Sequence, residues 1–179
     1  MSLHIHTSVP GRTGGAKPRR AHAPRPVVGS AARKTGRMSA STELTARVHG
    51  PVLARGAAGY DEELAGFQTG EPHRPDVVVG AQDAADVAAA VAFAAAHDLP
   101  VAVHATGHGR GAGLEGGVVI STRRMQGVQV YPDAGVAHVA AGARWAQVAE
   151  AAAEHGLAPL SGSFPAVGAV GYLLGGVSG

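Results

Sequence analysis

The distribution of apolar and polar positions divides the chain at about residue 74. Beyond it, short continuous apolar runs predict buried strands at 76–79, 100–103 and 117–121. Residues 83–97 instead repeat apolar side chains at helical spacing, which predicts a helix between the first two strands. A strand that follows a single crossover helix lies parallel to the strand before it. The pattern therefore predicts an α+β domain that opens with parallel strands.

The start of the predicted helix carries residues suited to capping. Asp83 is a plausible N-cap, because its side chain can accept a free amide of the first turn. Asp86 stands three residues later, where an acidic side chain can complete a weak capping box.

The last third of the chain shows a change of pattern. Strand-like runs at 128–131 and 136–141 flank a Pro-Asp-Ala-Gly turn, which predicts a hairpin. Residues 144–155 form an amphipathic helical stripe, and Gly156 is expected to end it in the left-handed conformation. Residues 159–179 are rich in glycine and contain only a short apolar run, so no regular element is predicted there.

The N-terminal part differs from the rest of the chain in charge and composition. Residues 1–37 carry eight basic residues and no acidic one, so the remainder has a net charge of −6. Prolines, glycines and unopposed charge predict a disordered basic tail over 1–40. It lacks interleaved aromatic residues and an amphipathic period, so we expect neither specific nucleic-acid binding nor membrane binding. Residues 41–73 are expected to form a lead-in of short helical pieces, with Asp61-Glu62-Glu63 on a solvated face.

Composition excludes several classes of site. The chain has no cysteine, which rules out disulfides, thiolate metal sites and cysteine nucleophiles and suits a cytoplasmic location. No apolar run is long enough to span a bilayer, and Arg19-Arg20 is not followed by the apolar region of a secretory signal. The ten histidines show no metal-ligand spacing, so we expect no metal site.

Residues 106–113 alternate glycine with other residues. Such a loop can turn several amides toward one point, as a pyrophosphate site requires. An ordinary dinucleotide motif would open a helix, but here a strand-like run, Val118-Val119-Ile120, follows. A phosphate-binding P-loop is excluded by the absence of Gly-Lys-Ser/Thr, while a surface loop without a ligand stays open as an alternative.

Several ordered blocks together resemble the berberine-bridge-enzyme-like branch of FAD-linked oxidases, which share the FAD-binding domain of the para-cresol-methylhydroxylase type. The blocks are Gly59-Tyr60-Asp61, Phe67-Gln68, Arg74-Pro75-Asp76-Val77-Val78-Val79, Asp86-Val87, 100–103, Gly107-His108, Ala141-Gly142-Ala143, 162–168 and 171–176. The resemblance implies that 74–179 is an FAD-binding domain, incomplete at its C-terminus, because family members continue into a substrate domain.

The resemblance also implies a set of flavin contacts. His108 matches the histidine that bonds covalently to the 8α-methyl carbon of the flavin. The pyrophosphate cradle falls on His104, Ala105, Thr106, Gly107 and Gly109, with Gly113 nearby. A second flavin-contacting segment falls on Phe164, Val167, Gly168, Gly171, Tyr172, Gly175 and Gly176.

The sequence departs from the family pattern at four of these places. His104 stands where arginine is common, and Thr106 stands where glycine is common. Phe164 occupies the position where doubly linked members have cysteine, so a single covalent link is expected. Val177 replaces a glycine of the usual Gly-Gly-Gly run and could crowd the flavin.

These observations lead to one expected function and two alternatives. The resemblance implies an FAD-dependent oxidoreductase that oxidises a small organic substrate by hydride transfer to covalently held flavin, with O2 as acceptor. No catalytic residue is identified in the chain. The alternatives are a catalytically inactive flavin-binding fragment and a basic-tailed interaction protein without a cofactor.

Overall fold

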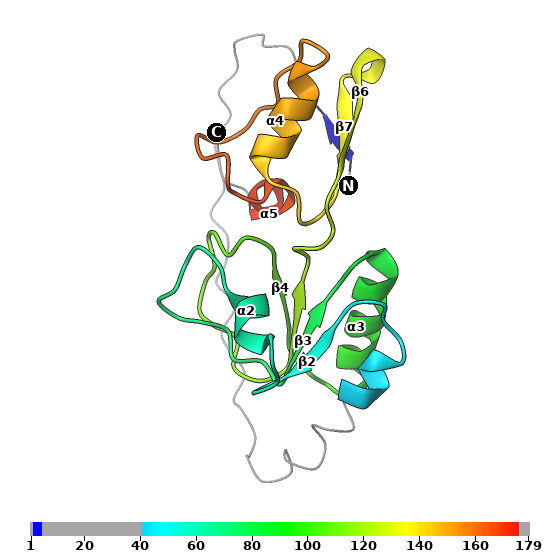
Figure 1. Ribbon diagram of the computed structural model, residues 1–179, viewed down its shortest axis with the longest axis vertical. Coiled ribbons are helices and arrows are strands. Elements are labelled where there is room, and N and C mark those ends of the chain that lie inside the picture. The colour runs from blue at the N-terminus through cyan, green and yellow to red at the C-terminus, as the bar shows by residue number, and fades with distance from the viewer. Residues whose placement is uncertain (1, 5–40, 176–179) are drawn as a thin grey trace, which may run out of the picture.

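The computed structural model describes residues 2–4 and 41–175, which form two lobes stacked along the long axis of the molecule (Figure 1). Each lobe is built around its own sheet, and the strand orders are β2-β3-β5-β4 and β1-β7-β6. The elements are β1 (Ser2–His4), β2 (Val52–Ala54), α2 (Tyr60–Leu64), β3 (Val77–Gly80), α3 (Ala84–Ala96), β4 (Val101–His104), β5 (Val118–Ser121), β6 (Val128–Tyr131), the 3-10 helix η1 (Pro132–Ala134), β7 (Val136–Val139), α4 (Trp145–Ala153) and α5 (Ala169–Gly175). Residues 41–45 are also helical.

The first lobe confirms the predicted parallel strands and crossover helix. Strands β3 and β4 both pair in parallel with β5, which lies between them. β2 adds an antiparallel edge next to β3. Sequence reasoning missed β2, because a strand of three residues gives too short a pattern to recognise.

Helices cover both faces of this sheet (Figure 1). Val77 and Val79 of β3 belong to the core cluster that contains Phe93 of α3. Val78 belongs instead to a cluster with Tyr60 of α2. β3 is therefore buried on both sides, which explains its continuous apolar sequence.

The capping residues of α3 behave only partly as predicted. Asp83 is the N-cap and accepts the amide of Asp86 at 2.9 Å. Asp86 does not complete a capping box, because its buried carboxylate accepts the amides of His49 at 2.7 Å, Gly50 at 3.0 Å and Gln82 at 2.9 Å. It thereby fastens the segment before β2 to the start of α3.

The second lobe confirms the predicted hairpin and helix. β6 and β7 pair antiparallel, and Gly135 between them has φ 62°. Gly156 follows α4 with φ 68°, in the left-handed region that was predicted. Helix α5 was not predicted, because Gly171 and Gly175 lower its helix propensity. Packing against the core of this lobe overrides that preference, since Ala169 is fully buried there.

Two predictions for the N-terminal part need correction. Ser2–His4 form a strand paired with β7, so these residues do not belong to a disordered tail. Glu63 is only 3 % exposed, so the solvated face predicted for 61–63 holds for Asp61 and Glu62 alone. Residues 5–40 and 176–179, and the predictions made for them, lie outside the described residues. Among the helices of the described chain, none combines the length and apolar character needed to cross a membrane.

Candidate functional site

The first glycine-rich loop leaves the sheet at the carboxyl end of β4. This is the edge of a parallel sheet at which ligands commonly bind. Gly107 and Gly109 have φ 72° and 64°, which glycine adopts without strain. The carbonyls of Thr106 and Gly107 accept the amides of Phe67 at 3.0 Å and Gln68 at 3.2 Å. The loop therefore lies directly beside the segment that follows α2.

Glycine is required at 107 for a second reason. A Cβ there would lie 2.9 Å from the Cα of Gly66, a separation that real Cβ atoms do not show. Gly109, by contrast, has open space where a Cβ would stand. Within the described chain, none of the amides from 107 to 113 donates a hydrogen bond to another residue. The loop can therefore offer amides to an anion.

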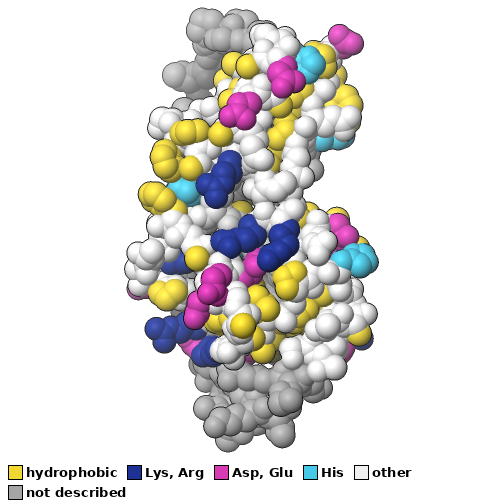
Figure 2. Space-filling view, viewed as in Figure 1, with side chains coloured by type: hydrophobic (Ala, Val, Ile, Leu, Met, Phe, Trp, Pro, Cys, Tyr) yellow, Lys and Arg dark blue, Asp and Glu magenta, His cyan; other side chains and the backbone are white. Residues whose placement is uncertain are grey.

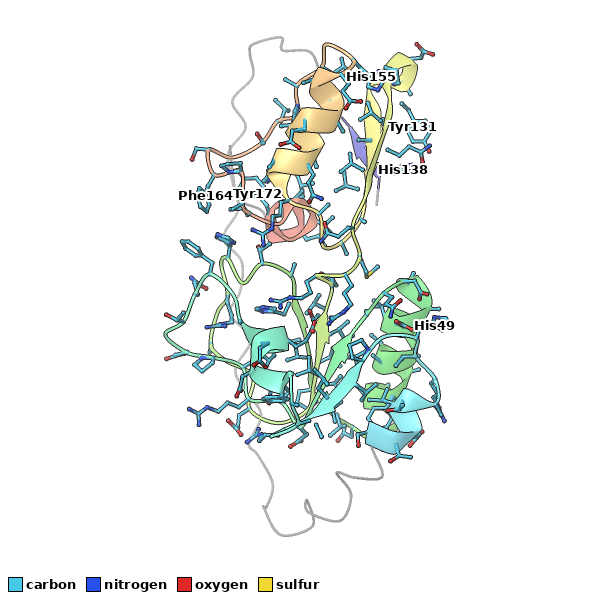
Figure 3. The ribbon with its side chains drawn as sticks, viewed as in Figure 1. His49, Tyr131, His138, His155, Phe164 and Tyr172 are labelled. Carbon is cyan, nitrogen blue, oxygen red and sulfur yellow. The ribbon has the colours of Figure 1, made fainter. Side chains whose placement is uncertain are left out.

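The second glycine-rich segment meets this loop across the boundary between the lobes. The amide of Gly168 donates to the hydroxyl of Thr106 at 3.1 Å. The ring centroid of Phe164 lies 5.6 Å from that of His108. Phe164 is drawn beside Tyr172, near the waist of the molecule (Figure 3). The two segments named from the sequence are thus brought together.

A cleft of about 490 Å³ lies where the segments meet. Basic side chains gather on the surface around the same waist (Figure 2). The cleft is lined by residues of both lobes, which are Ala65, Gly66, Phe67, Ala105, Thr106, His108, Arg123, Gln126, Gly142, Arg144, Phe164 and Ala166. Its aromatic and basic lining suits a ligand with both a flat ring system and negative charge.

His108 is held in the cleft by a stacking contact and a hydrogen bond. Its ring stacks on Phe67 with 4.1 Å between centroids and 15° between planes. Nδ1 lies 2.9 Å from the hydroxyl oxygen of Thr106. Nε2 is buried and finds no hydrogen-bond partner among the described residues. Burial, and after it the positive charge of Arg144, lower the pKa of His108 below its ordinary value, which favours a neutral imidazole at neutral pH.

The two arginines of the cleft have different tasks. Arg123 donates to the carbonyls of Glu62 at 2.7 Å and Ala65 at 2.6 Å, and so satisfies the C-terminal end of α2. Arg144 is exposed and donates to the carbonyl of Ala166 at 3.4 Å, a long contact. Arg144 is therefore the arginine of the cleft that can turn to an anion.

Eight lining residues were not among the predicted site residues: Ala65, Gly66, Phe67, Arg123, Gln126, Gly142, Arg144 and Ala166. Arg144 follows directly on the block Ala141-Gly142-Ala143, so a signal for it was present. Gln126 is held by bonds from its amide to the carbonyls of Arg123 at 2.6 Å and Gly142 at 3.0 Å. Nothing in its local sequence marks it as a site residue.

Two residues predicted to form the phosphate cradle, His104 and Gly113, instead contact the segments that precede β3. His104 is buried, and its Nε2 lies 3.3 Å from the carbonyl of Ala65. Burial lowers the pKa of His104, so its side chain does not supply the positive charge of an arginine. Gly113 packs against the preceding segment, because a Cβ there would meet the carbonyl oxygen of Pro72.

The predicted residues of the second segment also divide into two groups. Phe164 lines the cleft, and Gly168 contacts Thr106 beside it. Val167 packs in the core of the second lobe, and Tyr172 packs edge-on against Trp145 at 5.6 Å. The other predicted residues of this segment are Gly171 and Gly175, which have open space around them, and Gly176, which lies outside the described residues.

One group of side chains outside the cleft has the composition of a metal site. His49, Asp83 and Asp86 place ligand atoms within 4.8 Å of one another. The oxygens of Asp86 already accept backbone amides, and Asp83 caps α3. This group therefore has a structural role that explains it fully.

Known proteins are similar to this chain in both sequence and fold. Residues 75–179 match the family model described as an FAD binding domain. The (R)-6-hydroxynicotine oxidase of Paenarthrobacter nicotinovorans is 27% identical over 141 residues, which cover 78% of this chain and 31% of that protein. The FAD-dependent monooxygenase FUP4 of Fusarium proliferatum is 34% identical over 106 residues, which cover 58% of this chain and 20% of that protein.

A solved structure of another oxidase is similar to this chain in fold. The carbohydrate oxidase of Microdochium nivale, in complex with a substrate analogue, superposes with a TM-score of 0.66 and 28% identity, covering 74% of this chain and 29% of that one. The chain thus spans less than a third of the length of these relatives. Its parallel sheet, glycine loops and interlobe cleft agree with the family match, and the chain belongs to the FAD-binding domains of FAD-linked oxidoreductases, with a fold of the para-cresol-methylhydroxylase type.

Proposed function

We propose that the chain binds FAD in the cleft between its lobes and holds the flavin covalently through His108. The observation that carries this proposal is the state of His108. Its imidazole lines the cleft, and its Nε2 is buried without a hydrogen-bond partner in the described chain. A buried polar atom without a partner is costly, so it calls for a function or a ligand.

The other residues of the cleft fit the parts of FAD. The amides of 107–113 and the guanidinium of Arg144 would bind the diphosphate. Phe67 and Phe164 are 63% and 48% exposed, and they offer aromatic surface to the isoalloxazine ring beside His108. The diphosphate and the isoalloxazine ring thus find suitable groups in the cleft and in the loop beside it.

The covalent link is chemically balanced. An imidazole nitrogen forms a bond to the 8α-methyl carbon, while that carbon and the imidazole each release one proton. The electron pair passes through the flavin ring to an acceptor, for which we propose O2. A neutral imidazole is required as the nucleophile, and burial of His108 together with Arg144 favours that form by lowering its pKa.

The full reaction would be the oxidation of a small organic substrate. Bound flavin supplies an acceptor for a hydride and passes the electrons to O2. The residues of this chain would bind and orient the cofactor, and the rings of Phe67, His108 and Phe164 contact one another on one side of the cleft. Relatives named as oxidases of 6-hydroxynicotine and of carbohydrate support both the oxidative chemistry and the proposal of O2.

The test uses the 179-residue chain incubated with FAD and then precipitated with acid. We expect yellow colour in the pellet and an intact mass raised by one flavin. His108→Ala is expected to bind FAD reversibly and to release it into the supernatant. His155→Ala, which changes an exposed histidine of the second lobe, serves as the matched control and should retain the flavin. Flavin that stays in the His108→Ala pellet would refute the attachment site. A wild-type chain that retains no FAD before precipitation would refute the FAD site.

A further inference from the structure

The side chain of His73 holds the far end of the glycine-rich loop 106–113. Its Nδ1 accepts the backbone amide of Leu114 at 2.9 Å. A backbone amide can only donate, so this ring nitrogen carries no proton. The side chain is buried, which leaves little room for water to replace the contact. The contact therefore exists only while the imidazole of His73 is neutral, with its proton on Nε2.

The chain on either side of this contact is closely packed. The amide of Arg74 donates to the carbonyl of Leu114 at 2.7 Å. A Cβ on Gly113 would lie 2.5 Å from the carbonyl oxygen of Pro72. Because His73 and Leu114 follow directly on these two residues, they can separate only if the end of the loop moves.

His104, the last residue of β4, lies at the start of the same loop. Its ring meets that of His73 edge to face, with 5.9 Å between centroids and 87° between planes. Nε2 of His104 lies 3.3 Å from the carbonyl of Ala65, which can only accept, so this nitrogen carries a proton. A second proton on His104 would leave that bond in place, whereas a second proton on His73 would remove the acceptor of Leu114. His73 is therefore the histidine of the pair whose protonation breaks a contact of the loop.

The surroundings of His73 favour its neutral form. Burial, then the positive charge of Arg110, then His104 lower the pKa of His73. Arg110 and His104 carry no negative charge in any protonation state, so neither stabilises an imidazolium beside it. The pKa of His104 is itself lowered by burial and further influenced by Ala65, Arg123, Arg110 and Glu63. Protonation of His73 is therefore expected below the ordinary histidine pKa of about 6.5.

We propose that His73 is a positioning residue whose neutral form fixes the loop 107–113 for FAD binding, and whose protonation releases the loop and weakens that binding. This proposal rests on the proposed function of the cleft. His73 does not line the cleft and acts only through the loop. A protonated Nδ1 would direct a hydrogen at the amide hydrogen of Leu114, and two donors 2.9 Å apart repel each other. The displaced loop end lowers the fraction of chains whose amides are arranged for an anion, and the apparent affinity falls with that fraction.

The first test needs no flavin. NMR of the 15N-labelled chain follows the ring of His73 and the amide of Leu114 as the pH is lowered from 7. We expect the protection of this amide against hydrogen exchange to fall about tenfold as the ring is protonated, the factor expected for loss of one hydrogen bond. In His73→Asn the side-chain oxygen can accept the amide at every pH, so the protection should persist. His155→Asn, at an exposed histidine of the second lobe, is the matched control and should respond as the wild type does. Constant protection of Leu114 while the His73 ring titrates, or a ring that stays neutral until the chain unfolds, would overturn the proposal.

The second test measures the binding of FAD by fluorescence titration in the His108→Ala chain, in which no bond to that residue can form. We expect the dissociation constant to rise by up to about tenfold for each pH unit below the pKa of His73, as for a site that needs one neutral group. Adding His73→Asn should remove this rise, and adding His73→Leu, which offers no acceptor, should weaken binding at every pH. An equal pH dependence with and without His73→Asn would overturn the proposal. If FAD binds at no pH, the proposed function of the cleft fails, and the protection of Leu114 in the flavin-free chain still decides the role of His73.

Discussion

The carboxylate of Glu63 and the guanidinium of Arg124 meet at 2.5 Å beneath the junction of the lobes. The two residues stand far apart in sequence, one in α2 and the other in the turn after β5. The side chain of Glu63 is 4% exposed and that of Arg124 is 37% exposed. The ion pair therefore ties α2 to the chain that leads into the second lobe, and it is partly shielded from solvent.

Replacing Glu63 with Gln should reduce the free energy of unfolding by about 1.5–3 kcal/mol at pH 7, the usual range for a hydrogen bond to a charged group. Burial alone would raise the pKa of Glu63, but the hydrogen bond and charge of Arg124 lower it overall. A lowered pKa stabilises the fold above the unfolded pKa of about 4.3, and this contribution is lost as the pH falls through the folded value. Urea unfolding from pH 7 downward should therefore show this acid-dependent loss in the wild type and a smaller loss in Glu63→Gln.

The matched control for this pair is Glu62→Gln, since Glu62 is exposed on the same helix. We expect a change of less than about 0.5 kcal/mol, as is usual for surface substitutions. Equal effects of the two substitutions would contradict a special role for the buried carboxylate.

The difference between the predicted and the observed burial of Glu63 shows which parts of the fold the sequence could predict. Strands β3, β4 and β5 and helix α3 were predicted, because burial on both faces and helical spacing leave strong local patterns. The environment of Glu63 could not be predicted, because it depends on Arg124, which is distant in sequence and follows β5, a strand paired with β3. Helix α5 was missed for the same reason, since contacts with the second lobe outweigh its glycines.

Two glycines of the first loop allow a comparison of close approach with backbone strain. Gly107→Ala should destabilise the chain by about 2–4 kcal/mol, because it adds a clash with Gly66 to the cost of a left-handed alanine. Gly109→Ala has open space and should cost only about 1–2 kcal/mol. Thermal unfolding of both variants measures the difference. A Gly109→Ala variant as unstable as Gly107→Ala would show that the contact with Gly66 is unimportant.

In the candidate site, too, the features that could be predicted are those with a local sequence pattern, and the contacts between distant residues could not be predicted. The glycine loop and His108 were named from sequence because a dense run of glycines is visible locally. That Thr106 would bond to Gly168 could not be foreseen, because the two residues belong to different lobes. His104 was assigned to the phosphate cradle by its place in the motif, yet its side chain turns inward to the carbonyl of Ala65.

Arg144 and Arg110 should influence the pKa values of different histidines. Burial, and then Arg144, lower the pKa of His108, so Arg144→Gln should raise it by removing a positive charge. Arg110 contributes in the same direction at His73 and His104, in both cases after burial, so Arg110→Gln should raise those two pKa values and leave His108 unchanged. NMR titration of the histidine ring signals distinguishes the two variants. Because only neutral imidazole can bond to the flavin, Arg144→Gln should also shift the acid limit of flavin attachment to higher pH, whereas Arg110→Gln should not. A rise of the His108 pKa in both variants, or in neither, would contradict the assignment of Arg144 as the charge that keeps this imidazole neutral.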